Sequence, residues 1–285
     1  MDIEKEVSIY YKSLRLIGGF CFMSIWQAIV LGVIQGIAEF LPISSSGHLI
    51  LLQRVFGLDL PGMVFDIIVH LGSLVAVFVV FWRDIWELIK RPFQKMTLLL
   101  IIGTLPVVVS GFLFRNHIEE FSRNIPLLAL MFFITGIILC IADKLPLGTK
   151  SEKEMSYLDA LVVGVVQALA IFPGISRSGS TITGGLATGL TREMAARFSF
   201  LLSIISIIGA SVLEIWVMHD SETAIYSGDI FPFIIGFVAA ALSSYFAIRL
   251  LLQLIRTCKL RYFSYYLFIL VAWMLLDYFV LNWFF

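Results

Sequence analysis

Residues 31–50 read LGVIQGIAEFLPISSSGHLI, and residues 163–182 read VGVVQALAIFPGISRSGSTI. Aligned with a shift of 132 positions and no gap, the two stretches share ten of twenty residues, including a polar ISxSG core. Two unrelated apolar segments would match at a few positions by chance, but not across a polar core in register. The pair therefore indicates an internal duplication, with one repeat over about 23–142 and the other over about 157–285.

The composition around this duplication is that of a membrane protein. Of 285 residues, 60% are hydrophobic and 14% are charged, with a mean hydropathy of +0.97, whereas a soluble domain carries about 25% charged residues. The formal net charge is zero without a long charged run, so no nucleic-acid partner is expected. The three cysteines lack metal-ligand spacing and are interpreted as small apolar residues. Residues 1–22 do not resemble a signal peptide, and we interpret them as a dispensable N-terminal extension.

Six long apolar segments are each long enough to cross a bilayer as a helix, which takes about 20 residues. They lie at about 62–82, 97–114, 125–142, 198–218, 230–255 and 262–285. Two further segments, 24–41 and 157–172, have a helical pattern but contain polar residues and lead into a proline and a Ser/Gly-rich turn. A broken helix is tolerated at membrane depth only where its free backbone groups face protein or water. We therefore predict an all-α polytopic membrane protein with six transmembrane helices and two re-entrant helical hairpins.

Loop charges predict the orientation of this fold. If both hairpins are re-entrant, one set of loops carries twelve cations, and the opposite set, near 115–124 and 218–229, carries only Arg115 and Arg123. Positively charged loops stay in the cytoplasm. Three crossings separate the hairpins, so the first enters from outside and the second from inside, which is an inverted-topology repeat. We expect the two hairpin tips to face each other near the membrane midplane.

Each tip places hydroxyl residues and a glycine before a short helix. The free N–H groups and dipole of a helix N-terminus favour an anion, phosphate above all. Alternatively, these Ser and Gly residues only let helices pack closely. That explanation suits a single SxSG motif better than a duplicated pair of motifs that also contain Arg and His. The predicted substrate-binding residues are Ser44, Ser46, Gly47, Ser176, Ser178, Gly179, Thr181 and Gln35.

Four residues are candidates for catalysis: Ser45, His48, Glu39 and Arg177. Ionisable groups inside a membrane cost about 2.5–3.5 kcal/mol each and usually mark function. We predict that a serine attacks phosphorus, that His48 moves the proton, and that Arg177 and the helix ends stabilise the developing charge. Ser45 is preferred as nucleophile because the repeat places it opposite Arg177, and Ser44 is the alternative. Glu39 is expected to orient a catalytic group, act as a base or help hold a divalent ion.

Asp66 and His70 are four residues apart in the third helical segment. They are interpreted either as a proton relay or second site, or as a pair near the outer membrane interface.

These motifs resemble those of the undecaprenyl-diphosphate phosphatase family, the bacitracin-resistance proteins. The likeness rests on Gln35–Glu39 continuing through FLPISSSGH at 40–48, and on a PGxSRSxxT pattern at Pro173–Thr181. It implies hydrolysis of undecaprenyl diphosphate to undecaprenyl phosphate and inorganic phosphate on the outer side of the bacterial plasma membrane. This reaction would recycle the lipid carrier for cell-wall peptidoglycan synthesis and confer bacitracin resistance.

The resemblance also implies site residues and partners. Catalytic roles fall on Glu39, Ser45, His48 and Arg177, and a divalent cation (Mg²⁺ or Ca²⁺) is expected with Glu39 as a candidate ligand. Gln35 occupies the position where some members have a second glutamate, which weakens a two-carboxylate metal site. The expected partners are the polyprenyl diphosphate, membrane lipids and a second copy in a homodimer.

The alternative function is a polyprenyl-phosphate transporter or flippase, because inverted repeats with broken helices are typical of secondary transporters. The grouping of Ser45, His48 and Glu39 favours the enzyme, since a transporter needs an anion site but no nucleophile.

Overall fold

A computed structural model describes residues 23–58, 62–220, 230–257 and 259–285. Within these ranges the regular secondary structure is helical, with turns and loops between the helices and one isolated β-bridge between Lys150 and Leu190. The predicted N-terminal extension, 1–22, lies outside the described residues.

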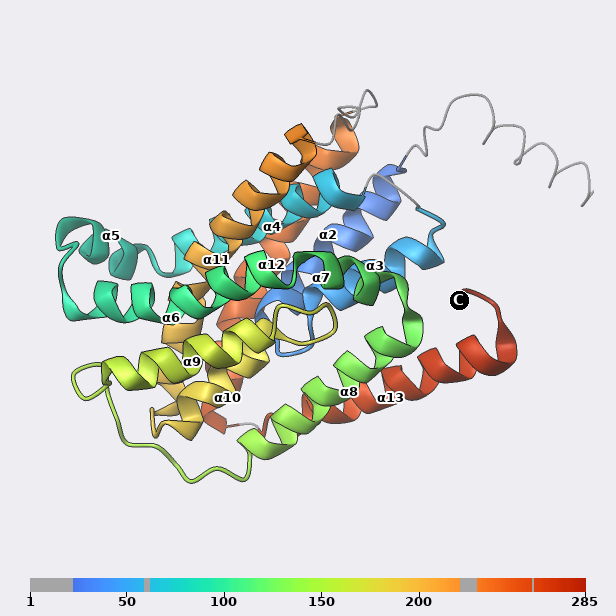
Figure 1. Cartoon of the computed structure of the whole chain (residues 1–285). Coiled ribbons are helices and arrows are strands. Elements are labelled where there is room, and N and C mark those ends of the chain that lie inside the picture. Colours follow the sequence, from blue (N-terminus) through green and yellow to red (C-terminus); the bar gives the residue numbers. More distant parts are fainter. Residues whose placement is uncertain (1–22, 59–61, 221–229, 258) are drawn as a thin grey trace, which may run out of the picture.

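Figure 1 shows the arrangement of the helices, with the two hairpins formed by α2 with α3 and by α9 with α10. Their bounds are α2 (Ile25–Phe40), α3 (Ser45–Val55), α4 (Gly62–Val80), α5 (Trp82–Lys90), α6 (Lys95–Leu113), α7 (Arg115–Arg123), α8 (Ile125–Ala142), α9 (Tyr157–Leu169), α10 (Arg177–Ala187), α11 (Arg192–Asp220), α12 (Phe231–Thr257), α13 (Arg261–Leu276) and the π-helix η1 (Asp277–Leu281).

Five helices of the described chain are long and apolar enough to cross a membrane: α6, α8, α11, α12, and α13 with η1. The segment predicted at 62–82 corresponds to α4, which ends at Val80, and α5 leaves it at an angle of 82°. Counting this bent pair as one span gives six. On α5, Ile85 is buried while Trp82 and Trp86 are exposed, as in a helix that lies along an apolar interface. The prediction of an all-α, multi-pass membrane protein is confirmed.

The first helix of each hairpin is shorter than a membrane span. Helices α2 and α9 have 16 and 13 residues, so they extend for about 24 and 20 Å at about 1.5 Å per residue. The hydrocarbon layer is about 30 Å thick. Both helices begin with a capping box, formed by Ser24 with Gln27 in α2 and by Ser156 with Asp159 in α9. These caps are also 132 positions apart, so the duplication extends to the starts of the helices.

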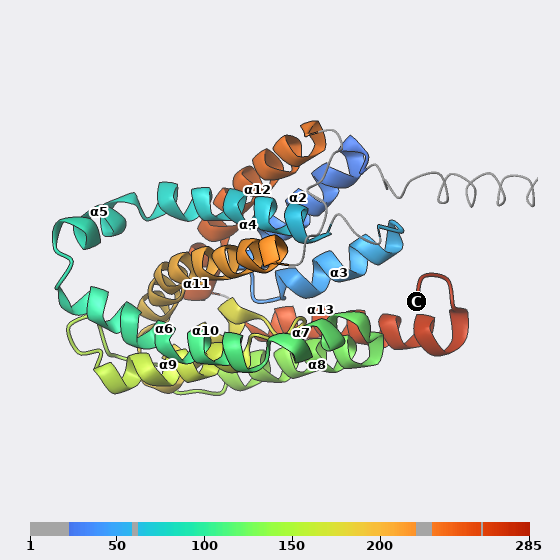
Figure 2. The same ribbon diagram turned by 45° about the horizontal axis from the view of Figure 1, so that its top comes forward.

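Each of these short helices packs against a long helix of the other repeat, α2 on α12 and α9 on α6. The contact is made by glycines at equivalent positions. A methyl group at Gly32 would lie 2.4 Å from the carbonyl oxygen of Gly236, and one at Gly164 would lie 2.4 Å from the carbonyl oxygen of Gly103. Only a residue without a side chain allows two backbones to approach this closely. In Figure 2, α2 and α12 form one side of the molecule and α6 and α9 the opposite side.

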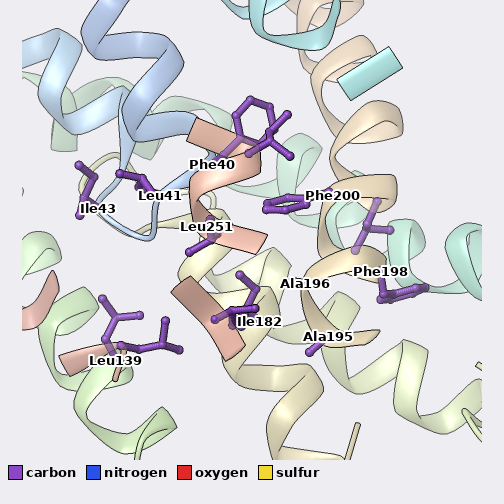
Figure 3. Close-up of a cluster of buried hydrophobic side chains, with 14 of the residues drawn as sticks. Phe40, Leu41, Ile43, Leu139, Ile182, Ala195, Ala196, Phe198, Phe200 and Leu251 are labelled. Atoms are coloured by element: carbon purple, nitrogen blue, oxygen red, sulfur yellow. The ribbon is translucent and has the colours of Figure 1, made fainter. Parts of the chain in front are cut away.

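The main hydrophobic core lies where the hairpin turns meet the long helices (Figure 3). Phe40, at the end of α2, packs edge-to-face on Phe200 of α11, with ring centroids 5.5 Å apart. Ile182 of α10 and Leu139 of α8 belong to the same cluster, and both are fully buried. This core therefore fixes both hairpin turns against α8 and α11.

The glycine contacts predict a paired effect on stability. Gly32→Ala and Gly164→Ala should each lower the free energy of unfolding by about 1–3 kcal/mol, because the added methyl group overpacks a backbone contact. Thermal unfolding of the purified protein in detergent measures this. Gly209→Ala is the matched control, since nothing lies within 4 Å of a methyl group there. Equal unfolding midpoints for all three variants would contradict the close packing.

Candidate active site at the hairpin tips

The two hairpin tips are in direct contact, as the duplication predicted. The backbone N–H of Gly174 donates to Ser44 Oγ at 3.1 Å, and Ser178 Oγ donates to the carbonyl oxygen of Leu41 at 3.3 Å. A methyl group at Gly47 would lie 3.0 Å from the Cα atom of Gly174. Residues from the two repeats therefore form a single site.

Glu39, the last acidic residue of α2, is the centre of this site. Its Oε1 atom accepts from Arg177 Nη2 across the contact between the tips. Its Oε2 atom accepts from Ser45 Oγ at 2.6 Å and from Gln35 Nε2 at 2.9 Å. The side chain of Glu39 is only 5% exposed, so these donors replace the water that would otherwise solvate the carboxylate. The predicted residues Glu39, Ser45, Arg177 and Gln35 are thus brought together.

Ser45 lies in front of this carboxylate. Ser45 and Arg177 are only partly buried, whereas Glu39 is buried. Because a carboxylate can only accept, the Ser45 hydroxyl donates its proton towards Glu39 and leaves the lone pairs on Oγ for other partners. This is the arrangement of a nucleophile with its general base. Ser44 differs, since its residue is 3% exposed and its Oγ already accepts from Gly174.

Two helix N-termini converge beside these side chains. The backbone N–H groups of Ser45, Ser46 and Gly47 at the start of α3 donate to no acceptor among the described residues. The same holds at the start of α10 for the N–H groups of Arg177 and Ser178. Free N–H groups and the helix dipole make such termini anion-binding sites. The predicted phosphate site therefore has donors from both repeats.

The hydroxyl groups of the second tip face the protein interior. Ser176 caps α10 by accepting from the N–H of Gly179 at 3.1 Å, and its own N–H donates to Thr135 Oγ1 on α8 at 3.0 Å. Thr181 Oγ1 lies 2.6 Å from Ser199 Oγ of α11. Ser176, Ser178 and Thr181 are each no more than 2% exposed. Their side chains hold the tip in place, so this tip presents backbone N–H groups and Arg177 to a ligand.

The structure does not bring His48 to Ser45 or Glu39. Its Nδ1 atom lies 2.7 Å from the carbonyl oxygen of Ser44, and its Nε2 atom lies 2.7 Å from the hydroxyl of Tyr266. The ring also packs edge-to-face on Phe132. Sequence patterns did not single out Tyr266, which is more than 200 positions away and reaches His48 only through the pairing of α13 with α8.

His70 joins the site from α4. Its Nε2 atom lies 3.6 Å from Glu39 Oε2, and its Nδ1 atom lies 2.6 Å from the backbone carbonyl oxygen of Asp66. Asp66 Oδ1 accepts from Gln53 Nε2 at 2.7 Å, and it is the backbone carbonyl oxygen of Asp66 that contacts the imidazole. Spacing along the chain identified Asp66 and His70 as neighbours on one helix face, but only the packing of α4 on α2 reveals the contact with Glu39.

The tips do not fit a preformed magnesium or calcium site. Among the described residues, no three His, Cys, Asp or Glu side chains are grouped around a position that a metal ion would occupy. Both oxygens of Glu39 accept from protein donors, and Arg177 places a positive charge against one of them. Divalent cations of this kind take about six or more oxygen ligands, and this single, fully engaged carboxylate does not supply them.

The fold and the site together define a class of protein: a multi-pass α-helical membrane protein in which a buried carboxylate, a serine and an arginine meet between two duplicated hairpins. The chain belongs to the family described as bacitracin resistance protein BacA, whose model matches residues 28–273.

Relatives of known name match almost the whole chain. An undecaprenyl-diphosphatase of Carboxydothermus hydrogenoformans is 47% identical over 248 residues, which cover 87% of this chain and 95% of that protein. Undecaprenyl-diphosphatases of Halothermothrix orenii and Methanosphaera stadtmanae are 42% and 40% identical, each over 86% of this chain and 94% of the relative.

The ion pair at the tips predicts a stability effect that is separate from activity. Arg177→Ala leaves the Glu39 carboxylate buried without its cation, which should cost about 3 kcal/mol. The double variant Arg177→Ala/Glu39→Gln removes the stranded charge and should recover part of that loss. Thermal unfolding in detergent measures both variants. A single variant that unfolds at the wild-type temperature would contradict the buried pair.

Proposed function

We propose that this chain is an undecaprenyl-diphosphate phosphatase that releases the terminal phosphate of the lipid and leaves undecaprenyl phosphate. The observation that carries the proposal is the hydrogen bond from Ser45 Oγ to Glu39 Oε2 at 2.6 Å, beside Arg177 and two open helix N-termini. The names of the relatives supply the substrate class.

In the proposed reaction, Ser45 is the nucleophile and Glu39 the general base. Glu39 takes the hydroxyl proton while Ser45 Oγ forms a bond to the terminal phosphorus. The bond from that phosphorus to the bridging oxygen breaks, and undecaprenyl phosphate leaves with the electron pair. A water molecule then attacks the phosphorus of the phosphoserine and the bond from Ser45 Oγ to phosphorus breaks. Inorganic phosphate leaves with the hydrogens of the water, and the proton held by Glu39 returns to Ser45 Oγ. Ser44 is less suited, because its side chain is buried in the contact between the tips.

Arg177 and the helix ends would stabilise the transferring phosphoryl group. Arg177 donates to Glu39 through Nη2, and its other N–H groups make no hydrogen bond to a described residue. A guanidinium donates in a planar fork that matches two phosphate oxygens. Fixed N–H dipoles at the starts of α3 and α10 add donors without needing to reorganise during the reaction.

The role predicted for His48 stays a prediction. With both ring nitrogens directed at Ser44 and Tyr266, His48 supports the proposed mechanism best as a brace for the start of α3. Glu39 is the better-placed acceptor for the Ser45 proton. The divalent-cation requirement and the homodimer also stay predictions, and no step above uses either.

The proposed membrane arrangement is six crossings with two re-entrant hairpins in an inverted-topology repeat. It is supported by the reciprocal packing of α2 on α12 and α9 on α6 through equivalent glycines and by the cation-rich loops on one side. In this arrangement the diphosphate reaches the tips from the outer side of the bacterial plasma membrane, while the polyprenyl chain stays among the apolar helices.

A transporter would bind the lipid phosphate at the same anion site but would need no nucleophile. The Ser45→Ala variant therefore distinguishes a phosphatase from a transporter. Wild-type protein in detergent should release phosphate from undecaprenyl diphosphate. Ser45→Ala should lower kcat by at least about a thousandfold, since it removes the group that attacks phosphorus, while the lipid still binds.

The control is Ser73→Ala, which deletes a buried hydroxyl on α4 that bonds only the carbonyl oxygen of Val69. It should retain wild-type release. Parallel reactions with EDTA and with added Mg²⁺ or Ca²⁺ test the cation prediction. Binding of the lipid without phosphate release by the wild type would contradict the phosphatase and favour a carrier.

A further inference from the structure

His70 occupies the one side of Glu39 that the proposed chemistry leaves unexplained. Of the groups around Oε2, Ser45 is the proposed nucleophile and Gln35 lies one turn earlier on the same helix. His70 approaches from a different helix, α4, with Nε2 at 3.6 Å from Oε2. Its side chain is 27% exposed, compared with 5% for Glu39, so it is more accessible than the carboxylate that it approaches.

The imidazole is held in a defined orientation. The partner of Nδ1 is a backbone carbonyl oxygen, that of Asp66, which can only accept a hydrogen bond. Nδ1 therefore carries a hydrogen, and Nε2 faces Glu39, to which it can donate only when the ring carries a hydrogen on both nitrogens. The hydrogen bond from Nδ1 at 2.6 Å fixes the ring plane. The backbone carbonyl group of Asp66 thus orients His70 towards Glu39.

The surroundings of His70 are acidic. Besides Glu39, the carboxylates of Asp66 and Glu214 interact electrostatically with it. Among the described residues, the nearest cation to the other side of Glu39 is Arg177. Glu39 is therefore flanked by Arg177 on Oε1 and by His70 on Oε2.

These two contacts would not be equivalent once substrate enters. A diphosphate carries several negative charges, and its oxygens would compete with Oε1 of Glu39 for the guanidinium of Arg177 and weaken that contact. The direction of the carboxylate towards the Ser45 hydroxyl would then depend more on the groups at Oε2, where Gln35 donates from the same helix and His70 lies on α4. His70 is anchored on α4 and does not depend on the phosphate, so its contact would persist.

We propose that His70 is a positioning residue that holds Oε2 of Glu39 towards the Ser45 hydroxyl while Arg177 engages the phosphate. The separation of 3.6 Å is longer than a hydrogen bond, and contacts of this kind often tighten only in the substrate complex. This inference rests on the proposed function, because it assigns His70 a role in the same reaction.

Two variants that replace the imidazole with an amide donor, at two different distances from the backbone, test this role. His70→Gln places an amide N–H at roughly the reach of Nε2, and His70→Asn carries the same group one methylene shorter. Phosphate release should show His70→Gln within about threefold of the wild-type kcat, whereas His70→Asn and His70→Ala lose about ten- to a hundredfold, as expected for a misplaced catalytic group. The KM for the lipid should change by less than about threefold in all three, because His70 does not bind the phosphate.

The matched control is His117→Ala, which removes an exposed histidine on α7 and should keep the wild-type kcat and KM. Thermal unfolding of each variant shows whether a low kcat comes from an unfolded protein or from a misplaced Glu39. The comparison of kcat between His70→Gln and His70→Asn still tests the proposal if His70→Ala does not fold. Wild-type kcat in His70→Asn, equal losses in Gln and Asn, or a rise in KM without a fall in kcat would each overturn the proposal. Absence of release by the wild type would instead contradict the proposed phosphatase itself.

Discussion

A carboxylate that is 5% exposed inside a membrane protein must be neutralised and hydrogen-bonded, and Glu39 meets this requirement through Arg177 from the other repeat. The two residues are 138 positions apart. Their pairing requires that both hairpin turns meet, that each first helix stops short of the far side, and that the long helices let the backbones come close. The glycine contacts of α2 with α12 and of α9 with α6 satisfy the last condition.

The two copies of the repeat share residues that pack and cap the helices, and they differ at residues to which the proposed reaction assigns a role. Positions that the two copies share serve packing and helix starts, such as Gly32 with Gly164 and the capping serines of α2 and α9. Positions where the copies differ carry the reactive groups, because Glu39 and Ser45 of the first copy correspond to an isoleucine and to Arg177 in the second. A symmetric fold thus brings together an asymmetric set of groups, with Glu39 and Ser45 on one tip and Arg177 on the other.

Much of this could be predicted from the chain alone, since local periodicity and the repeat locate the helices, the tips and the Glu39, Ser45 and Arg177 cluster. Contacts between distant helices could not. The partners of His48 and His70, Tyr266 and Glu39, depend on how α13 and α4 pack, and hydropathy carries no information on that. The sharp turn between α4 and α5 coincides with the end of the predicted segment at 62–82, but its angle of 82° does not follow from hydropathy. The inward direction of Ser176 and Ser178 follows from capping and tip contacts that only coordinates reveal.

The contact between the two tips is tested most directly by cross-linking Pro42→Cys with Gly179→Cys in a chain without its native cysteines. The Cβ position at Gly179 lies 3.1 Å from Cβ of Pro42, slightly closer than the spacing of about 3.5–4.5 Å in disulfides. After cleavage in the loop between the repeats, mild oxidation should keep the two halves joined until a reductant is added. Halves that separate without a reductant, as expected for a control pair of Pro42→Cys with Gly209→Cys, would contradict a shared site.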